Sequence, residues 1–299
     1  MKNTKCLVVT HGFFGDIAFA SSIAERLKSE NQFDQIDYLI GFPQMKSLLE
    51  NNPHIYNVFV SRTPTPLPDV SSIDLVYDKI ITLPALSFVE TPTIEYQKFA
   101  GVKNPSSEYK LYTNSTYDLH AQETLETEFR NVNKKKIIAV LKTWEEKSYL
   151  FTQEEYDRGI DVPNLGYGGK HRNINSIIEK LSEVYNIVYV GFPMQVSQHD
   201  SAIVEDDYME SIIYTASILK NCDAFVGTEG GLCNIAAGVG TKTIITGDFV
   251  HQLYGANGVI RKIKEPKLGP KYYFPDSNHV TLNPFLTDDE VFNEIVNNL

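Results

Sequence analysis

An aspartate stands between a short apolar run and a helical pattern near the start of the sequence. The stretch is "VVTHGFFGDIAFASSIAERL", residues 8–27, and the aspartate is Asp16. A carboxylate where a helix begins can cap backbone N–H groups or act on a ligand as a base. Both interpretations fit the local sequence. His11, Gly12 and Gly15 lie in the same turn and are candidates for contacting a substrate.

A second motif with chemical potential is "AFVGTEGGLCNIAAGVGTKTII", residues 224–245. Glu229, Gly230 and Gly231 lie between a predicted strand and a predicted helix. Such a junction offers backbone N–H groups and the positive end of a helix dipole, which suit a diphosphate. A glutamate there would repel phosphate, so it suits a ribose or sugar hydroxyl. A tight turn capped by Thr228 explains the same residues without a ligand, and the run is neither GxGxxG nor a P-loop.

Short apolar runs alternate with helical patterns along the chain. The predicted strands are 6–10, 36–40, 55–60, 73–82, 136–141, 186–192, 224–228 and 242–246. The predicted helices are 17–27, 44–52, 93–101, 173–184, 208–221, 231–239 and 287–298, and 117–130 is compatible with a helix. Such alternation is typical of parallel-sheet α/β units. We predict two Rossmann-like domains, 1–133 and 134–299, that face one cleft beyond the carboxyl ends of their strands.

Composition narrows the class of protein. The formal charge of −11 gives no general field for nucleic acid or an anionic membrane, and the dense basic stretch is "RKIKEPKLGPK", residues 261–271. Three cysteines without CxxC spacing favour reduced thiols over a disulfide framework or a zinc site. We find no signal peptide and no apolar run of about 18 residues, so we expect a cytoplasmic protein without a membrane span. A DxD metal motif is also absent, and we expect no metal site.

Several of these stretches resemble one known family. "GTEGGLCNIAAGVGTKTII" is similar to the donor-site signature of the heptosyltransferase-type glycosyltransferases, family 9, which have the GT-B fold. "GDIAFASSIAERLKSENQFDQIDYLI" and "LLENNPHIYNVFV" resemble the opening of that family, and "LKTWEEK" resembles a loop with a threonine four residues before a lysine, here Thr143 and Lys147. The sequence departs from the family at Asn234, where a histidine is usual, and in the long irregular segment 152–173.

The resemblance implies a GT-B fold and a metal-independent, inverting glycosyltransferase. It makes Asp16 the general base for an acceptor hydroxyl, with His11, Gly12 and Gly15 near the acceptor. It makes a nucleotide-diphosphate sugar the donor and co-substrate, with no further cofactor. The implied donor-binding residues are Thr143, Lys147, Glu229, Gly230, Gly231 and Asn234. By resemblance, the acceptor is a surface glycan or a lipopolysaccharide-like precursor.

Other functions stay open from the residues alone. The same fold could serve a glycosyltransferase that acts on a modified nucleic-acid base, using the basic stretch 261–271. A sugar-nucleotide epimerase would need no acceptor, and a non-catalytic nucleotide-sugar binding protein would leave its ligand unchanged. Asp16 as a helix cap and Lys147 as a surface lysine remain the simpler interpretations of those two residues.

Overall fold

The protein is described from a computed structural model of the 299-residue chain. The structure describes residues 4–10, 12, 14–62, 70, 76–86, 91–134, 136–141, 173–191, 212–228, 230–246, 279–282 and 286–299. The chain divides into two compact units. The first comprises Met1–Thr127, Glu205–Asn221 and Gly230–Thr241, and the second comprises Glu128–Val204, Cys222–Glu229 and Lys242–Leu299. The domain bounds inferred from the sequence, 1–133 and 134–299, stay a prediction.

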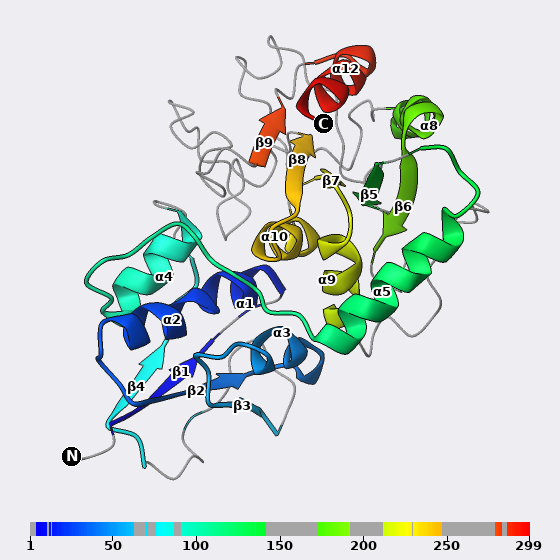
Figure 1. Cartoon of the computed structure of the whole chain (residues 1–299). Helices are drawn as coiled ribbons and strands as arrows, with labels where there is room; N and C mark the ends of the chain where they lie inside the picture. Colours follow the sequence, from blue (N-terminus) through cyan, green and yellow to red (C-terminus); the bar gives the residue numbers. More distant parts are fainter. Residues whose placement is uncertain are drawn as a thin grey trace, which may run out of the picture. The chain divides into compact units, whose positions relative to one another are not determined.

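The first unit is built on a parallel sheet in the order β3-β2-β1-β4. Its strands are β1 (Lys5–Val9), β2 (Gln35–Ile40), β3 (Asn57–Val60) and β4 (Lys79–Thr82) (Figure 1). β1 is buried from Cys6 onward, as expected of a continuous apolar strand with neighbours on both sides. β3 alternates exposed and half-buried residues because it is an edge strand.

Helices of the first unit come from distant parts of the chain. They are α1 (Phe14–Ala20), α2 (Ser22–Ser29), η1 (Pro43–Met45), α3 (Ser47–Glu50), α4 (Pro92–Ala100), α5 (Ser115–Glu128), α9 (Ile212–Lys220) and α10 (Gly231–Gly238). The single helix predicted after β1 is in fact two. Ser21 and Ser22 donate their hydroxyls back to the carbonyls of Ala18 and Phe19, at 2.7 and 2.8 Å, and such local bonds interrupt or bend a helix.

The second unit is built on another parallel sheet, in the order β6-β5-β7-β8-β9. Its strands are β5 (Ile137–Leu141), β6 (Asn186–Val190), β7 (Ala224–Gly227), β8 (Lys242–Thr246) and β9 (His279–Leu282). Two helices, α8 (Ile174–Val184) and α12 (Asp288–Asn298), pack against each other and are joined by an ion pair between Lys180 and Asp289. Thr287 and Glu290 form a capping box at the start of α12.

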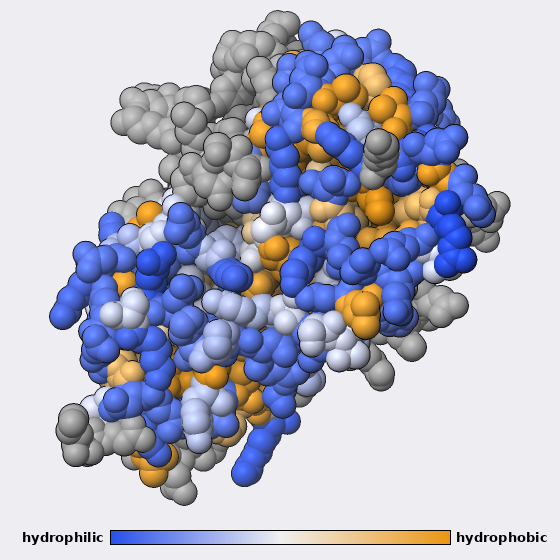
Figure 2. All heavy atoms as spheres, viewed as in Figure 1, coloured by the Kyte–Doolittle hydropathy of each residue, from blue (hydrophilic) through white to orange (hydrophobic). Residues whose placement is uncertain are grey.

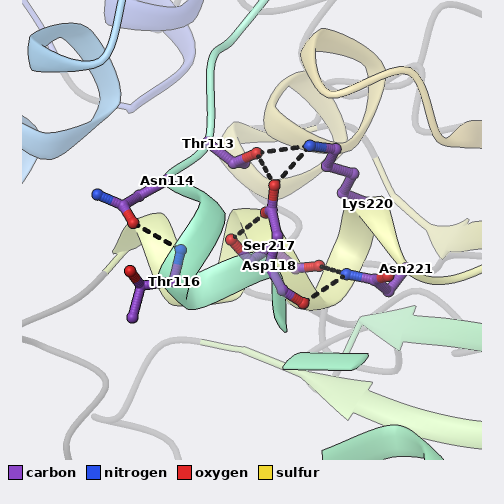
Figure 3. Close-up of polar contacts among 7 residues, drawn as sticks. All are labelled: Thr113, Asn114, Thr116, Asp118, Ser217, Lys220 and Asn221. Carbon is purple, nitrogen blue, oxygen red and sulfur yellow. Dashed lines mark hydrogen bonds and ion pairs between the residues drawn. The ribbon is translucent and has the colours of Figure 1, made fainter. Parts of the chain in front are cut away.

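A cluster of polar side chains ties α5 to α9. The Asp118 carboxylate accepts hydrogen bonds from Lys220 Nζ at 2.6 Å, Ser217 Oγ at 2.8 Å and Thr113 Oγ1 at 2.9 Å (Figure 3). Burial raises the pKa of Asp118, but these hydrogen bonds outweigh burial and hold it below its ordinary value. The cluster therefore fixes α9 within the first unit, although α9 lies between β6 and β7 in the sequence.

The coloured residues on the face shown in Figure 2 are mostly hydrophilic, with apolar patches between them. Within the described ranges, no helix is long and apolar enough to cross a membrane. The predicted α/β class with two parallel sheets is confirmed. Among the described elements, β9 was not predicted, because it is a short strand in a polar, proline-containing context.

Candidate functional site

The strand order of the first sheet reverses at β1. The next strand in the chain, β2, lies on one side of β1, and β4 lies on the other. In open parallel sheets, ligands bind beyond the carboxyl ends of the strands at such a switch point. Thr10 follows β1 and Leu83 follows β4, where the Leu83 N–H donates to the carbonyl of Val9 at 2.9 Å. The segment that carries Gly12 and leads into α1 with Asp16 therefore leaves the sheet at its expected ligand-binding edge.

Gly12, before α1, and Asp16, within α1, are in close contact. Gly12 has a φ of +85°, in the left-handed region that favours glycine. A Cβ added at Gly12 would stand 2.0 Å from Asp16 Oδ2, so no side chain fits without moving the carboxylate. Asp16 is half-buried and is the third residue of α1, within its first turn and not at the cap position. The carboxylate therefore lies over the α-carbon of Gly12.

Tyr96, from α4, contacts the same carboxylate. Its hydroxyl donates a hydrogen bond to Asp16 Oδ1 at 3.3 Å, and the side chain is 1% exposed. Burial raises the pKa of Tyr96, and the charge of Asp16 together with this hydrogen bond raises it further. The phenol therefore keeps its proton and acts as a donor to Asp16. No sequence signal marks Tyr96, because it lies 80 residues from Asp16.

The N-termini of α1 and α10 meet at two glycines. A Cβ on Gly231 would lie 3.1 Å from Phe14 Cβ and 3.6 Å from the Gly15 nitrogen. A Cβ on Gly15 would lie 2.7 Å from Asn234 Nδ2. Asn234 is buried, and its backbone carbonyl accepts a hydrogen bond from Tyr109 Oη at 2.6 Å. The missing side chains at positions 15 and 231 allow the two helix starts to approach closely.

Residues predicted for two different substrates thus lie together in the first unit. Asp16, Gly12 and Gly15 were predicted on the acceptor side, and Gly231 and Asn234 on the donor side. The α10 N-terminus, where the positive end of its helix dipole lies, is close to the start of α1. Where two helix starts meet, a half-buried carboxylate on one suits a hydroxyl, and the glycine-lined start of the other suits an anionic group.

The second unit has a switch point of its own. β5 is followed in the chain by β6 on one side, and β7 lies on its other side. At this edge a Cβ on Gly227 would lie 2.6 Å from Leu141 Cβ, so the ends of β5 and β7 are closely packed. Thr228 follows β7 and is 1% exposed, and among the described residues its hydroxyl has no hydrogen-bond partner. A buried hydroxyl without a partner is unusual, and a ligand group would satisfy it.

Four predicted site residues lie outside the described residues: His11, Thr143, Lys147 and Glu229. The basic stretch 261–271 and the irregular segment 152–173 also lie outside, apart from Asn173, which accepts a hydrogen bond as the cap of α8. In the part of the chain that the structure describes, no three His, Cys, Asp or Glu side chains are grouped as a metal site would need. The expectation of metal-independence stays a prediction.

Of the comparisons with known proteins, the one with solved structures identifies similar folds. No protein-family model matches the sequence, and the comparison with curated proteins finds no match. The solved structures, in contrast, include glycosyltransferases that match over nearly the whole chain, which defines the class of fold. One is a glycosyl transferase family 9 structure from Veillonella parvula, with a TM-score of 0.62, 11% identity, and 100% of this chain and 98% of that chain covered.

A second match is the ADP-heptose lipopolysaccharide heptosyltransferase II of E. coli. Its TM-score is 0.53 at 11% identity, with 99% of this chain and 98% of that chain covered. At this identity the similarity concerns the fold. The chain therefore has the α/β fold of these glycosyltransferases, and the predicted resemblance to the GT-B heptosyltransferase type is confirmed at the level of the fold.

Proposed function

We propose that this protein is a metal-independent, inverting glycosyltransferase that moves a sugar from a nucleotide-diphosphate sugar to an acceptor hydroxyl. One observation carries the proposal: the start of α1, the helix that carries the half-buried Asp16, meets the glycine-lined start of α10 at Gly15 and Gly231 in a chain with a glycosyltransferase fold. The proximity of Gly15 to Gly231 and Asn234 supports a site that serves both acceptor and donor. The heptosyltransferase named above makes ADP-heptose the first donor to test.

The proposed reaction is an in-line displacement at the anomeric carbon. The acceptor oxygen forms a bond to that carbon, the bond from the carbon to the diphosphate oxygen breaks, and the nucleoside diphosphate leaves with the electron pair. The hydroxyl proton passes to Asp16, the general base. Attack opposite the leaving group inverts the anomeric configuration. His11, Gly12 and Gly15 would lie along the acceptor, which we propose to be a surface glycan or lipopolysaccharide-like precursor.

The donor side combines residues of several turns. Gly230, Gly231 and the α10 N-terminus would receive the diphosphate, because backbone N–H groups and the helix dipole favour an anion there. Lys147 would offset the charge that builds on the leaving diphosphate. Thr143, Glu229 and Asn234 would bind the nucleoside and sugar hydroxyls. The protein would need no further cofactor.

The base is tested with Asp16→Asn, which keeps the size of the side chain and removes its ability to take a proton. We expect kcat to fall by about 10²- to 10⁴-fold. Donor binding, measured as the rise in Tm with ADP-heptose and other nucleotide sugars, should stay close to that of the wild type. Near-normal transfer by Asp16→Asn would contradict the assignment of the base.

The donor site is tested with Glu229→Ala in the same thermal-shift panel. A donor at about 100 times its Kd stabilises the wild type by about 2.7 kcal/mol, and the variant should lose most of this gain. The product's anomeric configuration, read by NMR, tests inversion, and transfer in excess EDTA tests metal-independence. Conversion of a nucleotide sugar without any acceptor would favour an epimerase instead.

A further inference from the structure

We propose that Tyr96 is a positioning residue for the Asp16 carboxylate, which it holds toward the switch-point edge of the first sheet. The inference deepens the proposed function and rests on it for its kinetic part. It starts from the hydrogen bond that Tyr96 Oη donates to Asp16 Oδ1 at 3.3 Å.

Contacts on two sides fix the carboxylate. Oδ1 faces the phenol of Tyr96 from α4, and Oδ2 lies over Gly12, where a Cβ would be 2.0 Å away. α4 itself packs against α1 and α2. Gln97, the next residue of α4, is fully buried and donates to Ser22 Oγ at 2.9 Å. The phenol is therefore held on a helix that is anchored to the helices carrying Asp16 and Ser22, so its hydroxyl has little freedom to turn away.

The electrostatic consequence follows from the direction of the hydrogen bond. A donor to the ionised carboxylate stabilises that form, so it lowers the proton affinity of Asp16. The pKa of the phenol moves in the opposite direction. Burial raises the pKa of Tyr96, and the Asp16 charge and the hydrogen bond raise it further. Tyr96 thus keeps Asp16 ionised and aimed, which a base that must receive a proton in the transition state requires.

Other titratable groups lie on the helices packed against α1. On α4, Glu95 lies near enough to Tyr96 to raise its pKa, and Lys98 follows in the last turn. α10 carries the Cys233 thiol, which lies against the Asn234 side chain. The charged side chains of α2 and α3 lie near other groups: Glu25 near Tyr112, Arg26 with Glu108, Lys28 with the carbonyl of Asp34, and Glu50 with Lys46. Tyr96 donates directly to the carboxylate, so its removal should change the titration of Asp16.

Tyr38 supplies a matched control. It is also a fully buried tyrosine of the first unit, and its hydroxyl donates to the carbonyl of Ala20, at the far end of α1, at 2.8 Å. Tyr38→Phe and Tyr96→Phe each remove one buried hydroxyl that bonds to α1, so both should lower the Tm. Only Tyr96→Phe removes a bond to the carboxylate.

The experiment follows the Asp16 carboxyl carbon by NMR in protein labelled at aspartate, with Asp16→Asn to assign the signal. In Tyr96→Phe we expect the titration midpoint to move to higher pH by about one unit, and in Tyr38→Phe we expect no shift. Replacing Tyr96 by 3-fluorotyrosine, a more acidic donor that keeps the ring, should move the midpoint to lower pH. Equal midpoints in all of these proteins would overturn the inference, whether or not the protein transfers a sugar.

Kinetics then separate this inference from the proposed function. In Tyr96→Phe the acidic limb of the pH profile of kcat/KM should move with the NMR midpoint, and kcat should fall about tenfold with the donor KM changed less than about twofold. In Tyr38→Phe the pH profile of kcat/KM and the value of kcat should stay those of the wild type. A shifted NMR midpoint in a wild-type protein that transfers no sugar from any donor would uphold the contact and reject the function. A loss of Tm with an unmoved midpoint and profile would make Tyr96 a structural residue only.

Discussion

At the scale of single residues, Gly12 and Gly240 have similar backbone conformations, but only Gly12 lies against a side chain of the candidate site. Their φ angles are nearly equal, +85° and +88°, and both lie in the left-handed region. A Cβ at Gly12 would be 2.0 Å from Asp16 Oδ2, whereas no atom of the described residues lies within 4 Å of one at Gly240. Alanine at either position bears the backbone strain, and only alanine at position 12 must also displace a carboxylate.

We therefore expect Gly240→Ala to lower the free energy of unfolding by about 1 kcal/mol, from strain alone. Gly12→Ala should lower it by about 2–3 kcal/mol, because steric crowding adds to the strain. Denaturant midpoints at constant slope measure both losses. In an Asp16→Ala background the carboxylate is gone, so adding Gly12→Ala should lower the free energy of unfolding by strain alone. This further loss should be about equal to the loss that Gly240→Ala causes in the wild type. Equal losses of unfolding free energy in Gly12→Ala and Gly240→Ala would show that the Asp16 carboxylate moves away from a side chain at position 12 at no cost.

At the scale of elements, the Asp118 cluster between α5 and α9 gives the fold a dependence on acid. The pKa of Asp118 is held below its ordinary value of 3.8, chiefly by the Lys220, Ser217 and Thr113 hydrogen bonds that outweigh burial. A carboxylate with a lowered folded-state pKa stabilises the fold above its unfolded pKa, and this contribution is lost as the pH falls through the folded pKa. The link between the two helices should weaken below about pH 4.

Asp118→Asn tests this link. The side chain is partly exposed, 24%, so solvent screening limits the loss to about 1 kcal/mol at pH 7. The difference in stability between Asp118→Asn and the wild type should shrink as the pH falls below about 4, since the wild-type carboxylate is then neutral too. Glu50→Gln is the control, because its pair with Lys46 at 3.6 Å is well exposed and should contribute less than about 0.5 kcal/mol. A pH-independent difference at position 118 would mean that packing, not charge, holds the helices together.

The elements themselves could largely be predicted from local patterns. Residues 242–246 form β8 as predicted, and the predicted helix 287–298 begins with the capping box of Thr287 and Glu290. Both succeed because a buried run and a cap are local signals. The break at Ser21 and the strand β9 were missed, since a serine back-bond and the pairing of a short polar strand with β8 depend on neighbours that the pattern does not show.

At the scale of the whole molecule, the candidate site was only partly predictable. Sequence motifs pointed to Asp16, Gly231 and Asn234. They did not indicate that Gly15 lies against Asn234, because this contact depends on the packing of α1 against α10. Tyr96 was missed for the same reason, because its contact with Asp16 is made by the packing of α4 on α1. Long-range packing therefore decides how the motif residues meet, and it adds a residue that no motif contains.

The charge of the whole molecule separates the proposed acceptor from its nucleic-acid alternative. With a formal charge of −11, the chain should repel a phosphate backbone unless the basic stretch 261–271 provides a local exception. We expect no binding to random duplex DNA in about 0.15 M salt, measured by fluorescence anisotropy. Binding that weakens steeply with salt would favour a nucleic-acid acceptor. Replacing Lys262, Lys264 and Lys267 by glutamine should then abolish this binding. The control is the same change at the exposed Lys46, Lys103 and Lys110, which alters the net charge equally and should only reduce the binding.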